Sequence, residues 1–277
     1  MVIKIPSGEM QTHAHIGKPG PNIYQQYTLR STILERANEE KDTGIHINHE
    51  LSFDEHISEK INKANSMFAL LRRTFQYLHA DSFVLLYKTL VRTHLEFASS
   101  VWHPYKFKHI DMIENVQIRA TKRLPGFKEL SYSERLKKLK LPTLSFRRVR
   151  GDMIELYKIL NDKYDREAAP FIKLWTDMAP RAGAWGNSKT LYPQRAKSEM
   201  RKNSFAIRVV KSWNSLPEEI VSVPTTHTFK NRLDKYCSNQ SLMYEDHKTT
   251  ITGSGDLRID DESNEEEPEG SCIGKPT

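Results

Sequence analysis

Residues 81–124 read DSFVLLYKTLVRTHLEFASSVWHPYKFKHIDMIENVQIRATKRL, and two runs of apolar residues with helical spacing lie within them. The first run follows Asp81, a good helix N-cap residue, and contains Phe83, Leu86, Tyr87, Leu90 and Val91. The second run contains Ile110, Ile113, Val116, Ala120 and Leu124. Because apolar residues three and four positions apart share one face of a helix, the spacing predicts two amphipathic helices.

The piece between these runs stays apolar until a proline ends it. Its apolar residues are Leu95, Phe97, Val101 and Trp102, and Pro104 follows them. Proline cannot supply the backbone N–H that a helix interior needs, so it marks a break. We therefore expect a helix, a buried corner and a second helix.

Further helices are predicted on both sides of this segment. The stretches Ser52–Glu55 and Ser131–Glu134 have the pattern of capping boxes, which open helices. The first should start a long helix that ends near Phe75, and the second a short helix that Pro142 stops. Apolar spacing predicts one more long helix over 144–160 and two shorter ones around 205–213 and 229–236.

Strand signals occur only near the N-terminus. Tyr27–Leu29 and Gly44–Ile47 have short β-branched or aromatic alternation, with a polar stretch over 35–42 between them. They could form a hairpin that needs a sheet to join. The fold class expected is therefore mainly α, a helical bundle with a short N-terminal β-hairpin and a disordered acidic tail.

Composition limits the class of protein. The 277 residues suggest about two domains, and 38% hydrophobic content is enough for a core. No apolar run is long enough to span a membrane, and no secretory signal opens the chain, so we expect an intracellular protein of the nucleus or cytoplasm with no membrane partner. Two distant cysteines, Cys237 and Cys272, support neither a disulfide framework nor a thiolate metal site.

Charge is distributed unevenly along the chain. The formal net charge is +7, but residues 249–277 hold eight acidic residues against Arg258 and Lys275. Residues 1–248 therefore carry 40 Lys and Arg against 27 Asp and Glu, a net charge of +13. Such a surplus favours a polyanionic partner, although a solvated cationic surface would give the same composition.

Ten basic residues are candidates for binding nucleic acid: Arg72, Arg73, Lys88, Arg92, Arg119, Lys122, Arg123, Arg147, Arg148 and Arg150. Those at the end of the 110–124 helix are also explained by the helix dipole, which favours cations at the C-terminal end. Arg147, Arg148 and Arg150 instead crowd the first turns of a helix, against the dipole. Arg148 could pair with Asp152, and either phosphate oxygens or a neighbouring carboxylate could compensate the rest.

Other residue types give weak signals for a site. The tryptophans Trp102, Trp175, Trp185 and Trp213 are more often core residues than platforms for bases. The histidine pairs His13/His15 and His46/His49 lack zinc-site spacing, so no metal site is predicted. Asp260–Asp261 lies in the acidic tail without flanking strands, which is not the setting of a polymerase carboxylate pair. We therefore predict no catalytic residues.

The order of residue types resembles a known family. The pattern is Tyr87-Lys88-x-x-Val91-Arg92-x-His94-Leu95-Glu96-Phe97-Ala98-x-x-Val101-Trp102-x-Pro104, followed by Gln117-x-Arg119-Ala120-Thr121-Lys122 and, later, Trp213-Asn214-Ser215-Leu216-Pro217. It resembles the thumb and downstream C-terminal region of non-LTR retrotransposon reverse transcriptases of the jockey-like type, over roughly residues 15–236. Thr93 departs from the proline that the family often has, and the acidic tail has no family counterpart.

The resemblance implies a fragment that lacks the catalytic palm and the endonuclease. Its parts would be an irregular N-terminus (1–25), the end of the palm (26–50), a thumb-like helical region (51–165), a C-terminal helical region (166–247) and the tail (248–277). Magnesium belongs to the intact family enzyme, so we expect no cofactor and no RNA-directed DNA polymerase activity for this chain alone. RNA or an RNA–DNA hybrid is the expected partner, with a palm domain or another protein chain as a further one. The alternative is a protein-interaction or structural remnant of a mobile element.

Overall fold

The computed structural model describes residues 38–75, 77–165, 167, 169–178, 187–238 and 241–244, with the backbone of four short strands before residue 38. The expected acidic tail at 248–277 lies outside the described residues, as does the expected irregular N-terminus apart from Val2–Ile3. No helix in the described part is both long and apolar enough to cross a membrane.

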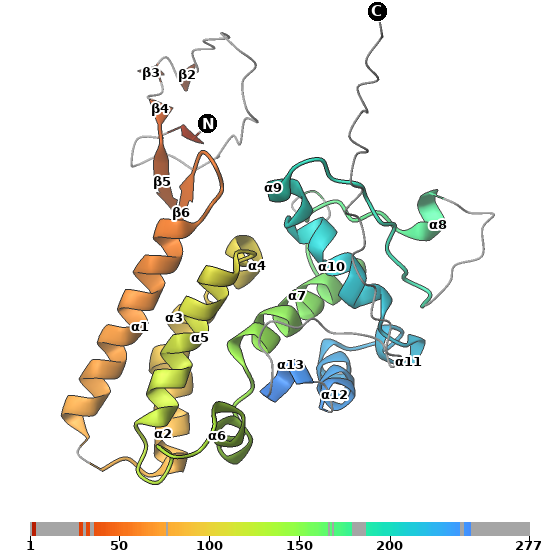
Figure 1. Ribbon diagram of the computed structural model, residues 1–277. Coiled ribbons are helices and arrows are strands. Elements are labelled where there is room, and N and C mark those ends of the chain that lie inside the picture. Colours follow the sequence, from red (N-terminus) through yellow and green to blue (C-terminus); the bar gives the residue numbers. More distant parts are fainter. Residues whose placement is uncertain are drawn as a thin grey trace, which may run out of the picture.

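Helices form most of the described chain (Figure 1). The strands are β1 (Val2–Ile3), β2 (Thr28–Leu29), β3 (Thr32–Ile33), β4 (Arg36–Ala37), β5 (Glu39–Asp42) and β6 (Ile45–Asn48). Next come α1 (Asp54–Thr74), α2 (Ala80–Leu86), a π-helix (Tyr87–Val91), α3 (Arg92–Glu96), α4 (Ser99–Trp102) and α5 (Phe107–Lys122). The later helices are α6 (Tyr132–Leu139), α7 (Leu144–Leu160), α8 (Trp175–Met178), α9 (Glu199–Lys202), α10 (Phe205–Asn214), α11 (Glu218–Val221), α12 (Thr226–Cys237) and α13 (Ser241–Tyr244). The predicted fold class is confirmed in its helical bundle and its small N-terminal hairpin.

The hairpin joins different strands from those expected. β5 pairs with β6 across a two-residue turn, Thr43–Gly44, whereas β2 pairs with β3. Both turn residues have positive φ, 44° and 87°, as the type I′ turn of tight hairpins requires. The prediction that 27–29 pairs with 44–47 was wrong, because a two-residue turn closes with less loss of chain entropy than a long connection.

The first predicted capping box does not form. Ser52 is held instead by Asn48, whose Oδ1 accepts from the Ser52 N–H at 3.0 Å while its Nδ2 donates to Ser52 Oγ at 2.8 Å. The residue before α1 is Phe53, with φ 55° and no side-chain cap. The second box is confirmed, since Ser131 and Glu134 bond reciprocally at the start of α6.

The first hydrophobic core lies among α1, α2, the π-helix, α3, α5 and α6. Its buried members include Ile57, Phe83, Val91, Ile113 and Leu136. In the expected corner, Leu95 of α3 and Trp102 of α4 are buried, and Trp102 Nε1 donates to the Phe97 carbonyl at 2.7 Å. The expectation of a wholly buried corner was wrong for Phe97 and Val101, which are about half exposed because the chain turns at Ala98 with φ 49°.

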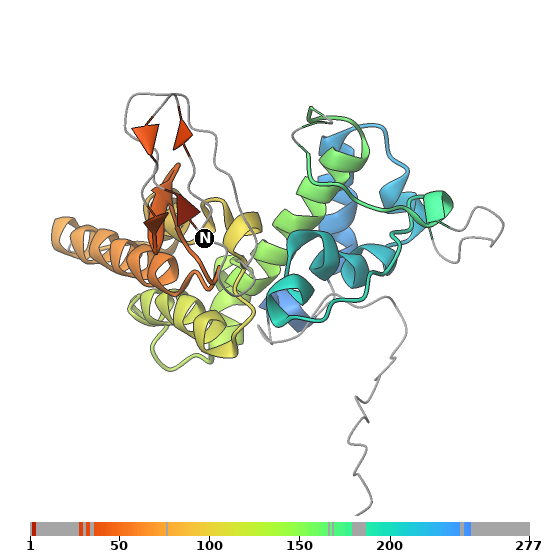
Figure 2. The same ribbon diagram turned by 90° about the horizontal axis from the view of Figure 1, so that it is seen from above.

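Helix α7 contributes to two hydrophobic cores. Leu144 at its start packs in the first core, whereas Phe146, Met153 and Leu156 belong to a second core with residues of α10, α11 and α12. Viewed from above, α1 and α5 lie on one side of the molecule and α9 to α12 on the other (Figure 2). The change from one core to the other therefore falls at the beginning of α7, and the three predicted helices over 144–160, 205–213 and 229–236 are confirmed.

Candidate nucleic-acid interface

Five basic side chains from two helices and one loop line a common pocket of about 640 Å³. Arg72 comes from the last turn of α1, Arg119 and Lys122 from the last turn of α5, and Arg123 and Lys128 from the chain that follows α5. We call these five residues the basic pocket. Helices α1 and α5 pack against each other and bring their C-terminal ends to the same end of the bundle (Figure 1).

The position of the basic pocket has a local cause. The last carbonyl groups of a helix carry partial negative charge, which favours cations in its last turn. Two helix ends meet here, so both α1 and α5 place basic residues at this point of the surface. The dipole explains why cations are tolerated at this end, but half a charge from each helix does not neutralise five full charges.

The side chains of the basic pocket are exposed and have no carboxylate partner within the described residues. Only Arg119 makes a side-chain hydrogen bond there, from Nε to the Asn115 carbonyl at 3.2 Å. Arg73, the neighbour of Arg72, is also exposed and without a carboxylate partner in this part of the chain. The cluster therefore presents a strong positive potential to solvent.

Arg147 and Arg150 have a different environment, because each forms a two-pronged ion pair. Arg147 donates from Nε and Nη2 to Glu96 at 2.6 and 2.8 Å, and this hydrogen bonding raises the pKa of Arg147. Arg150 donates in the same way to Asp234 at 2.5 and 2.8 Å. The sequence left two kinds of partner open for these arginines, phosphate oxygens or a neighbouring carboxylate. The structure provides carboxylates for both Arg147 and Arg150.

Arg148 lies inside the protein, with 2% of its surface exposed. Its Nη2 donates to Ser145 Oγ at 2.9 Å, and burial lowers the pKa of Arg148. Nε and Nη1 have no hydrogen-bond partner among the described residues. The expected Arg148–Asp152 pair does not form, because Arg208 from α10 takes both carboxylate oxygens of Asp152 at 2.9 Å.

Arg92 lies against the same carboxylate as Arg147, and Lys88 lies near both arginines. Arg92 Nε lies 3.4 Å from Glu96 Oε1, and burial lowers the pKa of Arg92. Burial also lowers the pKa of Lys88, with the nearby charges of Arg92 and Arg147 adding to the effect. Two partly buried arginines, Arg92 and Arg147, thus share one carboxylate.

The structure therefore separates the ten predicted residues. It brings Arg72, Arg119, Lys122 and Arg123 together, with Arg73 beside them. Arg92, Arg147 and Arg150 lie against carboxylates, Arg148 is in the interior, and Lys88 is partly buried near Arg92 and Arg147. Lys128 was missed by the sequence analysis. The sequence did contain a signal for Lys128. The dipeptide Pro125–Gly126 marks a loop directly after the helix that carries Arg119 and Lys122, and Lys128 lies in that loop, only a few residues from them.

Aromatic residues near cations were a second possible signal for nucleic acid. Trp102 and Trp213 are core residues, with 1% and 0% of their surfaces exposed, and Trp175 packs on Tyr192 with ring centroids 5.4 Å apart. Trp185 lies outside the described residues. Trp102 and Trp213 are therefore not available as platforms for bases, and Trp175 already packs on an aromatic neighbour.

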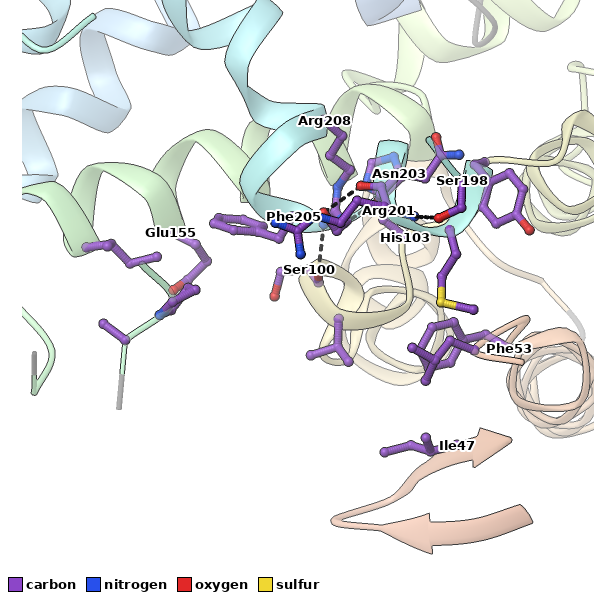
Figure 3. Close-up of a pocket in the computed structure, with 18 of the residues that line it drawn as sticks. Ile47, Phe53, Ser100, His103, Glu155, Ser198, Arg201, Asn203, Phe205 and Arg208 are labelled. Atoms are coloured by element: carbon purple, nitrogen blue, oxygen red, sulfur yellow. Dashed lines mark hydrogen bonds between the residues drawn. The ribbon is translucent and has the colours of Figure 1, made fainter. Parts of the chain in front are cut away.

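A larger pocket of about 1000 Å³ lies between the hairpin and the second core (Figure 3). Ile47 and Phe53 line it from the hairpin side, Val101 from α4, and Met200 and Phe205 from α9 and α10. Its lining is mostly apolar, and Val101 is 52% exposed. We call this cavity the apolar pocket.

One wall of the apolar pocket rests on a buried charge cluster. Arg208 binds Asp152 and also donates to the Ser100 carbonyl at 2.6 Å, while His103 Nδ1 lies 3.0 Å from Asp152 Oδ2. Burial alone would raise the pKa of Asp152, but the hydrogen bonds from His103 and Arg208 lower it. The cluster ties α4, α7 and α10 together.

No group of three or more potential metal ligands is found among the described residues. His46 is engaged by carboxylates, with Nδ1 3.0 Å from Glu39 Oε1 and Nε2 against Glu59. His13, His15, Asp260 and Asp261 lie outside the described part of the chain.

Comparisons of the chain with protein-family models, with curated proteins and with solved structures find no match. The fold and the site thus define a mainly helical protein with two hydrophobic cores, an exposed basic pocket and an apolar pocket.

Proposed function

We propose that this chain is a non-catalytic, thumb-like portion of a retrotransposon reverse transcriptase that binds the backbone of RNA or of an RNA–DNA hybrid. The observation that carries the proposal is the basic pocket, whose five exposed cations have no carboxylate partner in the described structure. The resemblance of residues 15–236 to the family supports it. Such a protein would work in the nucleus or cytoplasm, where its RNA is present.

The chemistry of the basic pocket suits phosphate oxygens. Arginine offers a planar fork of donors to a phosphate group, and lysine a compact charge. Arg72, Arg119 and Arg123 come from different segments, so a ligand that contacts them together must carry several negative charges in a row. A sugar–phosphate backbone has this arrangement, and its recognition does not depend on base sequence.

The proposal assigns no polymerase activity to this chain. In-line phosphoryl transfer needs metal ions held by positioned carboxylates, and the sequence has no carboxylate pair set in a hairpin between apolar strands. Primer extension in the presence of magnesium is therefore expected to give no product. Magnesium belongs, in this proposal, to the complete family enzyme.

The experiment that tests the proposal is a salt titration of binding to a labelled RNA–DNA hybrid. Replacing Lys122 and Arg123 by Glu should weaken binding at least about tenfold at low salt and flatten the dependence of affinity on salt, because fewer counterions are released. Binding that is absent at low salt in the unaltered protein would contradict the proposal.

A matched control separates the basic pocket from net charge. Lys211 and Lys235 are exposed on α10 and α12, beside the second core, and replacing both by Glu changes the net charge equally. This control should bind the hybrid nearly as well as the unaltered protein. An equal loss in both double variants would show that net charge alone governs binding.

The apolar pocket favours a second candidate function, in which the chain docks an apolar segment of another protein. Soluble proteins seldom expose large contiguous apolar surfaces unless these bind something. Ile47, Val101 and Met200 give this pocket such a surface from three different parts of the chain (Figure 3).

A further inference from the structure

An exposed tyrosine lies in the connection between α1 and α2, a few residues after the first member of the basic pocket. Tyr77 is 87% exposed, and its hydroxyl group has no hydrogen-bond partner within the described part of the chain. Phe75 in the same connection is 42% exposed. These two rings are apolar surface that the fold leaves open to solvent.

Chain geometry places both residues close to Arg72, the member of the basic pocket at the end of α1. Phe75 is the C-cap of α1: its N–H donates to the Leu71 carbonyl at 3.0 Å, and its own backbone turns to an extended conformation that leads the chain away from the helix. Residues three apart on a helix are surface neighbours, at roughly 5–6 Å between Cβ atoms, which puts Phe75 next to Arg72. Tyr77 lies two residues further on, and therefore within about 7 Å of Phe75 measured between Cα atoms.

Described residues on both sides of Tyr77 are held by the rest of the protein. Phe75 is tied to α1 by its backbone hydrogen bond, and Leu78 packs against the first core. Tyr77 is therefore exposed between two residues, Phe75 and Leu78, that are each held in place. A tyrosine ring has only two side-chain torsions, so it loses little conformational entropy when a planar ligand stacks on it.

We infer that Tyr77, supported by Phe75, stacks on an unpaired base of a nucleic acid whose phosphates occupy the basic pocket. This inference rests on the proposed function and adds a ligand class to it, namely a strand with unpaired bases next to a duplex. Cationic residues that hold the backbone, with an aromatic face for the bases, are the two components of single-strand recognition. Bases in the middle of a duplex are stacked on each other and cannot use the ring.

The test compares hybrids that differ only in the bases of an overhang. One RNA–DNA hybrid is blunt, a second has a short single-stranded overhang, and a third has an overhang of equal length made of abasic nucleotides. The second and third carry the same number of phosphates, so a difference in affinity between them reports contacts with bases. We expect the overhang with bases to bind at least about fivefold more tightly than the abasic one.

Variants assign this difference to one ring. Tyr77→Ala should abolish the gain that the bases provide while leaving affinity for the blunt and abasic hybrids unchanged. Tyr77→Phe should keep the gain because it keeps the ring. Phe171→Ala is the matched control, since Phe171 is 77% exposed outside the basic pocket, and it should keep the gain as well.

The outcomes distinguish this inference from the function on which it rests. If the blunt hybrid does not bind, the proposed function fails. If the blunt hybrid binds and Tyr77→Ala keeps the gain from bases, the proposed function stands and the stacking inference is overturned. An equal loss on the abasic overhang would also overturn it, because the ring would then support the fold or the phosphate contacts.

Discussion

At the scale of single residues, the partner of each charged side chain decides whether that side chain is available to a ligand. Arg147 and Arg150 are satisfied by Glu96 and Asp234, so releasing either one to bind phosphate would leave a half-buried carboxylate without its partner. Arg72 and Lys128 have no such competitor in the described structure. Side chains of equal formal charge thus differ in whether they can bind a phosphate, because some are already paired with a carboxylate and others are not.

His56 is the buried titratable residue with the clearest consequence for stability. Its ring is fully buried, lies 5.2 Å from the Trp102 ring between centroids, and accepts at Nδ1 from the His46 N–H. Burial, together with the positive charges of Lys60 and His46, lowers the pKa of His56 to about 4. The folded protein therefore holds His56 neutral well below pH 6.5.

We predict that this histidine makes the protein less stable in mild acid. Between pH 6.5 and 4 the unfolded chain binds a proton at His56 that the folded chain does not, so the free energy of unfolding falls as pH falls. The contribution is roughly 1 to 3 kcal/mol across this window. His56→Asn keeps an acceptor for the His46 N–H but cannot titrate, so its stability should fall less steeply.

Urea unfolding of both proteins at several pH values measures this difference in slope. His49→Asn is the matched control, because it makes the same substitution at an exposed histidine directly after β6. A His56 ring that titrates near pH 6.5 in an NMR experiment would contradict the prediction.

At the scale of elements, residues close together in sequence fix the turns and helices, and the positions of these elements then determine where the cavities form. The Thr43–Gly44 turn sets the register of β5 and β6, with Asp42 opposite Ile45. That register leaves Ile45 buried while Ile47 lines the apolar pocket. A short turn thereby places one wall of a cavity that the other elements complete.

Two glycines should respond to the same substitution with opposite signs. Gly44→Ala should destabilise the protein by about 1 kcal/mol or more, because its φ of 87° is unfavourable for a residue with a Cβ. The added Cβ itself would lie 3.6 Å from the Phe97 ring, an ordinary contact, so the backbone carries the cost. Gly151→Ala should stabilise by about 0.5–1 kcal/mol, since Gly151 is inside α7 and an added Cβ meets nothing within 4 Å.

Chemical denaturation of the two variants measures both effects in one series. A shift in the same direction for Gly44→Ala and Gly151→Ala would mean that backbone conformation does not dominate at these positions.

At the scale of the whole molecule, the two cores and the space between them set where a partner could bind. The basic pocket lies at the end of the first core, formed by the ends of α1 and α5, whereas the apolar pocket lies between the hairpin and the second core. The Asp152–Arg208 pair and the Ser100 carbonyl connect α4 to α7 and α10 beside the apolar pocket. The basic pocket and the apolar pocket thus lie in different regions of the molecule, so each could bind its own ligand.

The apolar pocket predicts self-association of the purified chain. Without a natural partner, exposed apolar surface is buried most readily against a second copy, so the apparent mass in size-exclusion chromatography should rise with protein concentration. Val101→Asp, at the wall of the apolar pocket, should shift the protein towards a monomer. Leu85→Asp alters a side chain that is 64% exposed outside this pocket and should leave the mass unchanged.

A monomer at every concentration would remove the case for docking at the apolar pocket. It would leave the basic pocket, and the binding experiment with the hybrid, unaffected.

The sequence by itself determined the elements, because helical spacing, caps and turn residues act over a few positions. The periodic runs at 110–124 and 144–160 became α5 and α7, and Ser131–Glu134 became a capping box. It also identified most of the basic pocket as candidate residues. The hairpin register and the failed box at Ser52 show that a competing local partner can still override a motif.

Only the tertiary structure decided which cations are free to meet a ligand. Arg147 and Arg150 find carboxylates 51 and 84 positions away, and Asp152 finds Arg208 56 positions away. No local pattern reports contacts at such separations, because they follow from the packing of α7 against α3, α10 and α12. The same packing brings the ends of α1 and α5 together and so gathers the basic pocket from segments about 50 residues apart.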